Sequence, residues 1–191
     1  MRSTIENALD EAAHALEALR ADEGLLQALG RVAETLVEVL SRRGRVLACG
    51  NGGSLADALH FAEEWTGRFR ADRPPYAVLA LGEATHLTCV ANDFGYEHVF
   101  ARQVEALGHP GDMLVLLSTS GNSPSIVRAA EAARKQGMHV VGFLGKGGGT
   151  VLPLCDEGMV FPGETSDRIQ ELHMLCLHAL IEAAEKGLGH A

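Results

Sequence analysis

From residue 45 onward, short apolar segments alternate with helical patterns, and this alternation limits the possible folds more than any other feature of the chain. Segments that are apolar at every position suit strands that are buried on both faces, and such strands belong to parallel sheets covered by helices. We therefore predict an α/β fold with a parallel sheet of about five strands flanked by helices. The predicted strands are residues 45–50, 76–81, 113–118, 139–144 and 158–161.

Helical spacing of apolar residues predicts the elements around this sheet. Two long helices come first, and no linker or low-complexity segment separates them from the strands. We expect residues 1–43 to form an N-terminal helical pair used in oligomer packing, and residues 44–191 to form the α/β core of a single domain. The remaining helices are predicted at residues 55–67, 84–91, 96–107, 125–136 and 166–186.

Charge and hydropathy exclude several classes of function. The 191 residues carry a formal net charge of −9, and without basic clusters such a chain is a poor binder of nucleic acid. No apolar run approaches the roughly 20 residues of a membrane span, and no segment resembles a secretion signal, so we expect a cytoplasmic protein. The four cysteines lack metal-binding spacing and are expected to be buried, reduced thiols.

Two segments rich in glycine or hydroxyl groups follow predicted strands, where open α/β sheets bind their ligands. The first, residues 50–54, reads Gly-Asn-Gly-Gly-Ser and leads into a helix. This combination suits an anion, but it is also common as a purely structural turn. It lacks the Gly-Lys-Ser/Thr of a Walker A loop and the third glycine of a dinucleotide-binding motif, so a nucleotide site is disfavoured.

The second segment, residues 118–123, reads Ser-Thr-Ser-Gly-Asn-Ser and also joins a strand to a helix. One or two of these side chains would suffice to cap the helix, which is the alternative explanation. The hydroxyl and amide groups can instead donate to all three oxygens of a phosphate monoester. We therefore favour a phosphate-binding site here.

Two helices carry polar residues with the spacing of metal ligands. His60 and Glu64 are four positions apart on one helix face, so an imidazole and a carboxylate can reach one divalent metal. By spacing alone, a solvated face with Glu64 paired to Arg68 is the more common arrangement. Gln170 and His178 lie two turns apart along one side of the last, largely apolar helix, where a hydrogen-bonded core histidine is the alternative.

Residues 49–54 together with residues 118–123 resemble the sugar isomerase (SIS) domain. Residues 60–68, 167–173 and 92–95 are similar to three signature segments of the phosphoheptose isomerases, and the similarity covers essentially the whole chain. The resemblance implies a single SIS domain with a flavodoxin- or Rossmann-like sheet. It further implies conversion of sedoheptulose 7-phosphate to D-glycero-D-manno-heptose 7-phosphate, the first step toward the activated heptoses of bacterial surface glycans such as lipopolysaccharide.

The same resemblance, carried over by position, implies the residues of the site. His60, Glu64, Gln170 and His178 would bind one zinc ion per subunit, and Glu64 and His178 would be the catalytic acid/base pair. The family implies a homotetramer with active sites at subunit interfaces, and it stays open which subunit supplies each residue. Trp65 is a departure, because a smaller aliphatic residue is common there. The implied substrate contacts are Asn51, Gly52, Gly53, Ser54, Glu64, Asn92, Asp93, Ser118, Thr119, Ser120, Ser123 and Gln170.

Relatives of this fold also belong to other functional classes. Some SIS-fold proteins act as interaction proteins, one of which binds the bacterial replication initiator, and others would sense sugar phosphates without turnover. The interaction proteins depart from the isomerases at the carboxylate and histidine positions. This chain has both Glu64 and His178, which favours the enzyme over the interaction protein. The sensing module stays open as a second alternative, which an isomerase assay distinguishes from the enzyme.

Overall fold

The computed structural model describes residues 1–190, and its strands form one five-stranded, all-parallel sheet. The strands are β1 (Val46–Gly50), β2 (Val78–Ala80), β3 (Met113–Ser118), β4 (His139–Leu144) and β5 (Glu157–Val160). Their order in the sheet is β2-β1-β3-β4-β5, which is the order of flavodoxin-like doubly wound folds. This arrangement confirms the predicted fold class.

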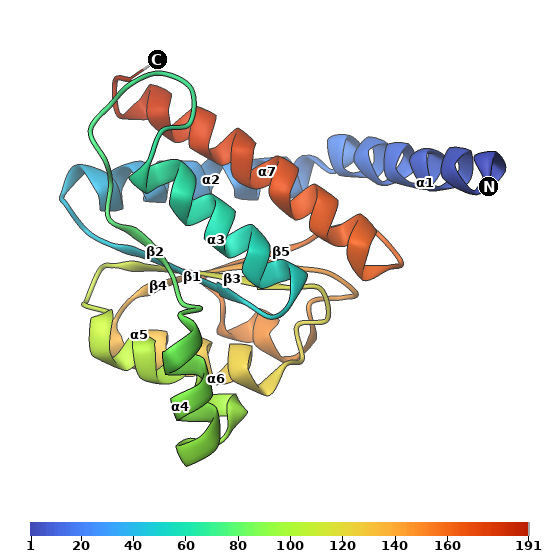
Figure 1. Cartoon of the computed structure of the whole chain (residues 1–191). Helices are drawn as coiled ribbons and strands as arrows, with labels where there is room; N and C mark the ends of the chain where they lie inside the picture. Colours follow the sequence, from blue (N-terminus) through green and yellow to red (C-terminus); the bar gives the residue numbers. More distant parts are fainter. Residues whose placement is uncertain (191) are drawn as a thin grey trace.

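Helices cover both faces of the sheet in the described part of the chain. They are α1 (Arg2–Ala21), α2 (Glu23–Ser41), α3 (Gly53–Thr66), α4 (Ala84–Phe94), α5 (Ala101–Leu107), α6 (Pro124–Gln136) and α7 (Ser166–Gly187), with two short 3-10 helices, η1 (Tyr96–His98) and η2 (Gly149–Leu154). Figure 1 shows α2, α3 and α7 over one face and α4, α5 and α6 over the other.

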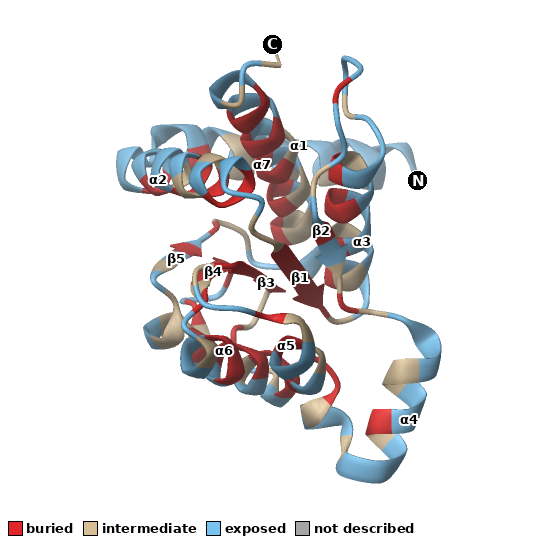
Figure 2. Ribbon diagram, turned by 90° about the vertical axis from the view of Figure 1, so that its left-hand side faces the viewer, coloured by how far each residue is buried: buried red, intermediate tan, exposed pale blue. Residues whose placement is uncertain are grey.

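Alternate residues of each central strand pack into two separate hydrophobic cores. In β1, Val46 and Ala48 pack with residues of α2, α3 and α7, whereas Leu47 and Cys49 pack with residues of α5 and α6. Side chains of a strand point alternately to opposite faces, which explains the division. Figure 2 shows the buried residues concentrated in the sheet and on the helix faces that meet it.

The N-terminal helix α1 extends away from the body of the molecule (Figure 1). Leu19 is its only buried residue, whereas Ile5 and Leu9 keep 62% and 65% of their surface exposed. Asp22 lies between α1 and α2, and its carboxylate caps α2 by accepting from the backbone N–H of Leu25 at 2.9 Å. The first helix therefore buries little apolar surface within its own chain.

Two sequence-based expectations are corrected by the structure. Residues 96–107 do not form one helix, because the fully buried Val99 and Phe100 separate η1 from α5. Val99 closes η1 with a 3-10 hydrogen bond to the Tyr96 carbonyl at 3.3 Å, whereas the α-helical bonding of α5 begins at Phe100, whose carbonyl accepts from Val104 at 2.9 Å, so the two hydrogen-bond patterns do not join. All four cysteines are free, but Cys89 is exposed and Cys155 half-buried, so the expectation of buried thiols is wrong there.

None of the helices within residues 1–190 is both long and apolar enough to cross a membrane.

Candidate active site

The two candidate loops meet at one edge of the sheet because β1 and β3 are adjacent and parallel. In this strand order the direction of winding reverses between β1 and β3, which is where doubly wound sheets bind ligands. Asn51, directly after β1, donates from its side-chain amide to the hydroxyl of Ser125, in the first turn of α6, at 3.0 Å. The first loop therefore contacts the start of the helix that follows the second loop.

The loop after β3 is held in shape by its own polar groups. The Ser118 hydroxyl accepts from the backbone N–H of Gly121 at 3.1 Å, and the Ser120 hydroxyl accepts from that of Asn122 at 3.2 Å. Gly121 has a φ of +62°, and a Cβ there would lie 1.9 Å from the carbonyl oxygen of Gly148. Only glycine fits at this position, so the loop conformation is fixed by the fold.

A polar cavity of about 120 Å³ opens between the two loops. Ser54, Ser123 and Ser166, which line it, stand at the N-terminal ends of α3, α6 and α7. Helix N-termini present unpaired N–H groups and partial positive charge, which favour an anion. The cavity therefore suits a phosphate group. Its lining consists of Asn51, Ser54, Leu117, Ser118, Thr119, Ser120, Ser123, Ser166 and Gln170.

Gln170 reaches this cavity from the second turn of α7. Its Nε2 atom donates to the Ser54 hydroxyl at 3.3 Å. Gly53 permits the approach, because a Cβ at that position would lie 2.8 Å from the Gln170 amide. Gly52, which precedes α3 as its N-cap, completes the turn from β1 into the helix. The structure thus places Gln170 at the end of the site where the polar cavity lies.

His60, Glu64 and His178 converge further along the contact between α3 and α7. The Nε2 atom of His60 lies 3.1 Å from Glu64 Oε1 and 3.2 Å from His178 Nε2, and the distance from His178 Nε2 to Glu64 Oε1 is 4.0 Å. The side chains of His60 and His178 are about half exposed, whereas that of Glu64 is 14% exposed. A single chain brings all three residues together.

The chemistry of this triad fits a divalent metal ion. Two imidazole nitrogens and a carboxylate oxygen are a common ligand set of catalytic zinc. In a tetrahedral site with metal–ligand distances of about 2.0–2.1 Å, the ligand atoms lie about 3.3 Å apart. Two of the three observed separations, 3.1 and 3.2 Å, are close to this value. A cation between the facing Nε2 atoms would satisfy both lone pairs.

Two further side chains shape the surroundings of the triad. The ring of Phe69 stacks on the imidazole of His178, with centroids 5.8 Å apart and an interplanar angle of 30°. Asp57, one turn before His60, is half-buried, and this burial raises the pKa of its carboxyl to about 6, against a smaller lowering by His60. Its Oδ2 atom has no hydrogen-bond partner among the described residues.

Two predicted substrate contacts lie away from the cavity. Asn92 and Asp93 are exposed residues of α4, and the Asn92 amide donates to the Asp93 carboxylate at 2.7 Å. Figure 2 shows α4 at the periphery of the molecule. Tyr96, just beyond α4, does reach the site, because its hydroxyl donates to Asn51 Oδ1 at 2.8 Å. The structure therefore connects this region to the first loop through Tyr96.

Sequence reasoning missed three residues at the site: Ser125, Ser166 and Tyr96. Ser125 accepts from Asn51, and the Ser166 hydroxyl lies 3.1 Å from that of Thr119. Both serines stand in the first turn of a predicted helix near a candidate loop, which was a usable signal. The contact of Tyr96 carried no such signal, because it depends on how the chain folds back after α4.

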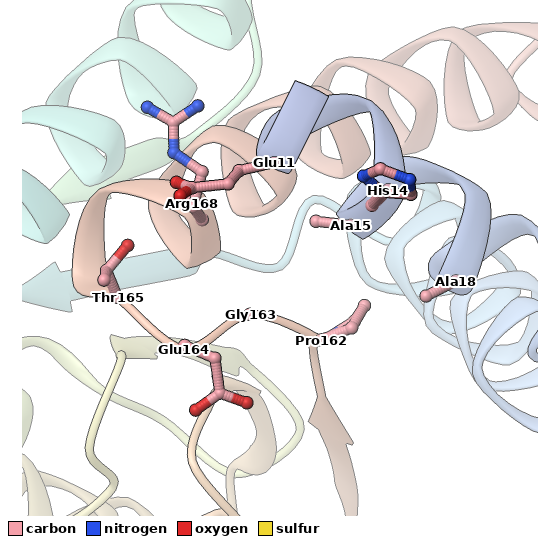
Figure 3. Close-up of a pocket in the computed structure, with 9 residues that line it drawn as sticks. All are labelled: Glu11, His14, Ala15, Ala18, Pro162, Gly163, Glu164, Thr165 and Arg168. Carbon is pink, nitrogen blue, oxygen red and sulfur yellow. The ribbon is translucent and has the colours of Figure 1, made fainter. Parts of the chain in front are cut away.

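A larger hollow of about 410 Å³ lies between α1 and the segment that precedes α7 (Figure 3). The Arg168 guanidinium on its wall is already paired with Asp167 and Glu171, at 3.2 and 2.9 Å. None of the predicted catalytic, substrate-binding or metal-binding residues lines this hollow. The smaller polar cavity and the adjacent triad are therefore the better candidate for an active site.

Comparison with known proteins identifies relatives along nearly the whole chain. The family model for the SIS domain matches residues 4–145. A phosphoheptose isomerase from Aeromonas hydrophila is 49% identical over 183 residues, which cover 95% of this chain and 95% of the relative. Another, from Fusobacterium nucleatum, is 49% identical over 156 residues, covering 82% of this chain and 80% of the relative.

Solved structures agree with these relatives. Phosphoheptose isomerase GmhA from Neisseria gonorrhoeae superposes with a TM-score of 0.89 at 36% identity, covering 97% of this chain and 98% of that one. A phosphoheptose isomerase from Francisella tularensis superposes with a TM-score of 0.92 at 32% identity, covering 96% and 97%. The similarity in sequence and the similarity in structure thus point to the same group of proteins.

Proposed function

We propose that this chain, which belongs to the phosphoheptose isomerases of the SIS domain family, converts sedoheptulose 7-phosphate to D-glycero-D-manno-heptose 7-phosphate. One observation carries the assignment of the site: the contact between α3 and α7 has a polar cavity at one end and the His60–Glu64–His178 triad further along. An isomerase of sugar phosphates needs two separate parts of this kind, because one part holds the phosphate while the other moves a proton at the opposite end of the sugar.

The length of the site agrees with a seven-carbon substrate. Ser54 and His60 are six residues apart on α3, which corresponds to about 9 Å along the helix axis. An extended heptulose 7-phosphate spans roughly 9–10 Å from C1 to phosphorus, at about 3.5 Å for every three backbone-like bonds. With its phosphate in the cavity beside Ser54, such a sugar brings C1 and C2 level with the triad.

The residues around the cavity would bind the phosphate and orient the sugar. Ser118, Thr119, Ser120 and Ser123 offer hydroxyl groups, and the N-terminal ends of three helices offer backbone N–H groups. Gly52, Gly53, Ser54 and Asn51 belong to the same cradle. In our proposal Asn92 and Asp93 contact the sugar itself, which requires α4 to approach the cavity when substrate binds.

Glu64 and His178 would perform the proton transfers. Isomerisation moves a proton between C1 and C2 through an enediol, so it needs a base at carbon and a second group at the oxygens. Both contacts of Glu64 to the histidines use Oε1, which leaves Oε2 to face the carbon proton. Because Nε2 of His178 faces the triad and would bind the metal, the other ring nitrogen, Nδ1, would handle the proton of a sugar oxygen or ring opening, with the ring steadied by Phe69.

Zinc is part of this proposal, with His60, Glu64 and His178 as ligands and Gln170 as the fourth. The Gln170 amide is bonded to Ser54 in this structure and would have to turn toward the triad to coordinate. When bound, zinc supplies a Lewis acid that polarises a sugar carbonyl and stabilises negative charge on its oxygen. The half-exposed histidines leave the metal position accessible to a substrate oxygen.

The assembly and the biological setting complete the proposal. We infer a homotetramer in which residues 1–43 pack against other copies, because α1 leaves Ile5 and Leu9 exposed within one chain. Active sites would then lie at subunit interfaces, where a neighbour covers the exposed side of the triad. We place the reaction in the cytoplasm, as the first step of activated-heptose synthesis for surface glycans.

The decisive experiment follows heptose 7-phosphate formation by NMR with sedoheptulose 7-phosphate as substrate. Wild type loaded with zinc is compared with a chelated sample, with Glu64→Gln and with Glu63→Gln, an exposed carboxylate one position earlier on the same helix. We expect product from the loaded wild type and from Glu63→Gln only. Turnover by Glu64→Gln at the wild-type rate would refute the role of Glu64, and turnover after chelation would remove zinc from the reaction.

A further inference from the structure

The segment that leads from α3 back to β2 buries a single guanidinium group. The side chain of Arg73 is only 1% exposed, and that of Glu185, its partner on α7, is 6% exposed. Arg73 Nε donates to Glu185 Oε1 at 2.7 Å, Nη2 donates to the backbone carbonyl of Glu64 at 2.7 Å, and Nη1 donates to that of Trp65 at 2.8 Å. This is a fully engaged, buried ion pair.

These bonds close the C-terminal end of α3. The last carbonyl groups of a helix have no partner within the helix, and a cation there also opposes the negative end of the helix dipole. Arg73 serves the carbonyls of Glu64 and Trp65 with one planar group, which a guanidinium can do because its donors point in fixed directions. The rings of Trp65 and Tyr76 enclose it, at 5.1 and 5.5 Å from the guanidinium carbon.

The position of this ion pair relative to the triad is the important feature. Arg73 bonds the backbone of Glu64 itself, so it holds a triad residue directly. Glu185 lies seven residues beyond His178, which is two turns along the same side of α7. One guanidinium therefore ties together α3, which carries His60 and Glu64, and α7, which carries His178.

We propose that Arg73 and Glu185 are positioning residues that set the spacing of α3 and α7 at the triad, and thereby its affinity for metal and the rate of turnover. The inference rests on the metal site of the proposed function. Neither Arg73 nor Glu185 binds the metal or touches substrate. Both side chains act through the backbone of Glu64 and the placement of His178.

Two substitutions separate positioning from general stability. Arg73→Lys keeps the charge, but one ammonium nitrogen cannot reach Glu185 and both carbonyls in the same geometry. Glu185→Gln keeps the shape and removes the negative charge. If either variant is too unstable, the apolar double variant Arg73→Met with Glu185→Leu is used, since replacing a whole buried ion pair is often tolerated while the contacts to the Glu64 carbonyl are lost.

The chain also provides a matched control. Arg70 and Glu182 link the same segment to the same helix at 2.9 Å, one turn earlier on α7, but their side chains are 64% and 47% exposed. An exposed ion pair contributes little to the spacing of two helices. Glu182→Gln therefore matches Glu185→Gln in chemistry and differs from it in burial. Arg70 is left unchanged, because its guanidinium lies 5.1 Å from the ring centre of Phe69, which stacks on His178.

The test measures zinc affinity by competition with a chromophoric chelator, under conditions where circular dichroism shows each apoprotein to be folded. We expect Arg73→Lys and Glu185→Gln to bind zinc about 10-fold or more weakly, as for other partners that orient ligands, and to lower kcat with little change in KM. The control variant Glu182→Gln should stay within about twofold of wild type. If folded Arg73→Lys and Glu185→Gln bind zinc as tightly as wild type, the positioning role is refuted and the proposed metal site still stands. If wild type itself binds no zinc, the proposed metal site is refuted as well.

Discussion

Acidification should destabilise this protein through His173, a residue of α7 that faces the sheet and not the triad. Its side chain is fully buried against the rings of Phe143 and Phe161, with centroid distances of 5.8 and 4.8 Å. One ring nitrogen, Nε2, lies 3.3 Å from the carbonyl oxygen of Leu144, and Nδ1 has no hydrogen-bond partner within residues 1–190. Burial lowers the pKa of His173 from 6.5 to about 4, opposed in part by the Leu144 carbonyl.

The direction of the effect follows from proton linkage. The unfolded chain takes up a proton on this imidazole below pH 6.5, whereas the folded protein resists protonation until about pH 4. The contribution of neutral His173 to stability is therefore fully present above pH 6.5 and is lost as the pH falls toward 4. This difference between the unfolded and folded pKa values contributes about 3 kcal/mol to the free energy of unfolding. About 2 kcal/mol of that contribution is lost between pH 7 and pH 5.

The assay compares wild type with His173→Gln by urea unfolding of the metal-free proteins at pH 7 and pH 5. Glutamine can still donate to the Leu144 carbonyl but does not titrate, and every other titrating group cancels in the comparison. The variant should be less stable at pH 7 but should lose about 2 kcal/mol less than wild type on going to pH 5. Parallel losses in the two proteins would refute the reasoning.

Three other substitutions test the loops and the triad. Gly121→Ala should lower the free energy of unfolding in urea by about 3 kcal/mol or more, because its Cβ would lie 1.9 Å from the Gly148 carbonyl at a φ of +62°; an undiminished urea midpoint would contradict this. Gly53→Ala should raise KM about tenfold by displacing the Gln170 amide, with unchanged KM as the contrary result. His178→Ala should abolish tight zinc binding in calorimetry, whereas retained affinity would place the metal elsewhere.

Local chemistry made much of the fold predictable from the sequence. The strands of residues 113–118 and 139–144 are found at their predicted bounds. The bounds were predictable because each strand is a continuous apolar run whose ends are marked by the turn residues on either side of it. The pairing of His60 with Glu64 is also local, since positions four apart on a helix must overlap. The helix predicted across residues 96–107 was wrong, because the apolar spacing there does not distinguish a 3-10 turn followed by a short α-helix from one continuous α-helix.

The sequence by itself therefore determined the strands, the polar loops that follow them, and which residues share a helix face. Each of these features depends on contacts over a few residues. At that range, the 3.6-residue period of a helix and the two-residue period of a strand fix which side chains share a face. Only the tertiary structure decided that β1 lies beside β3, that the Gln170 amide bonds Ser54, and that Arg73 reaches Glu185. These contacts join distant parts of the chain, and they are determined by the order of the strands and by how α3 and α7 pack on one face of the sheet.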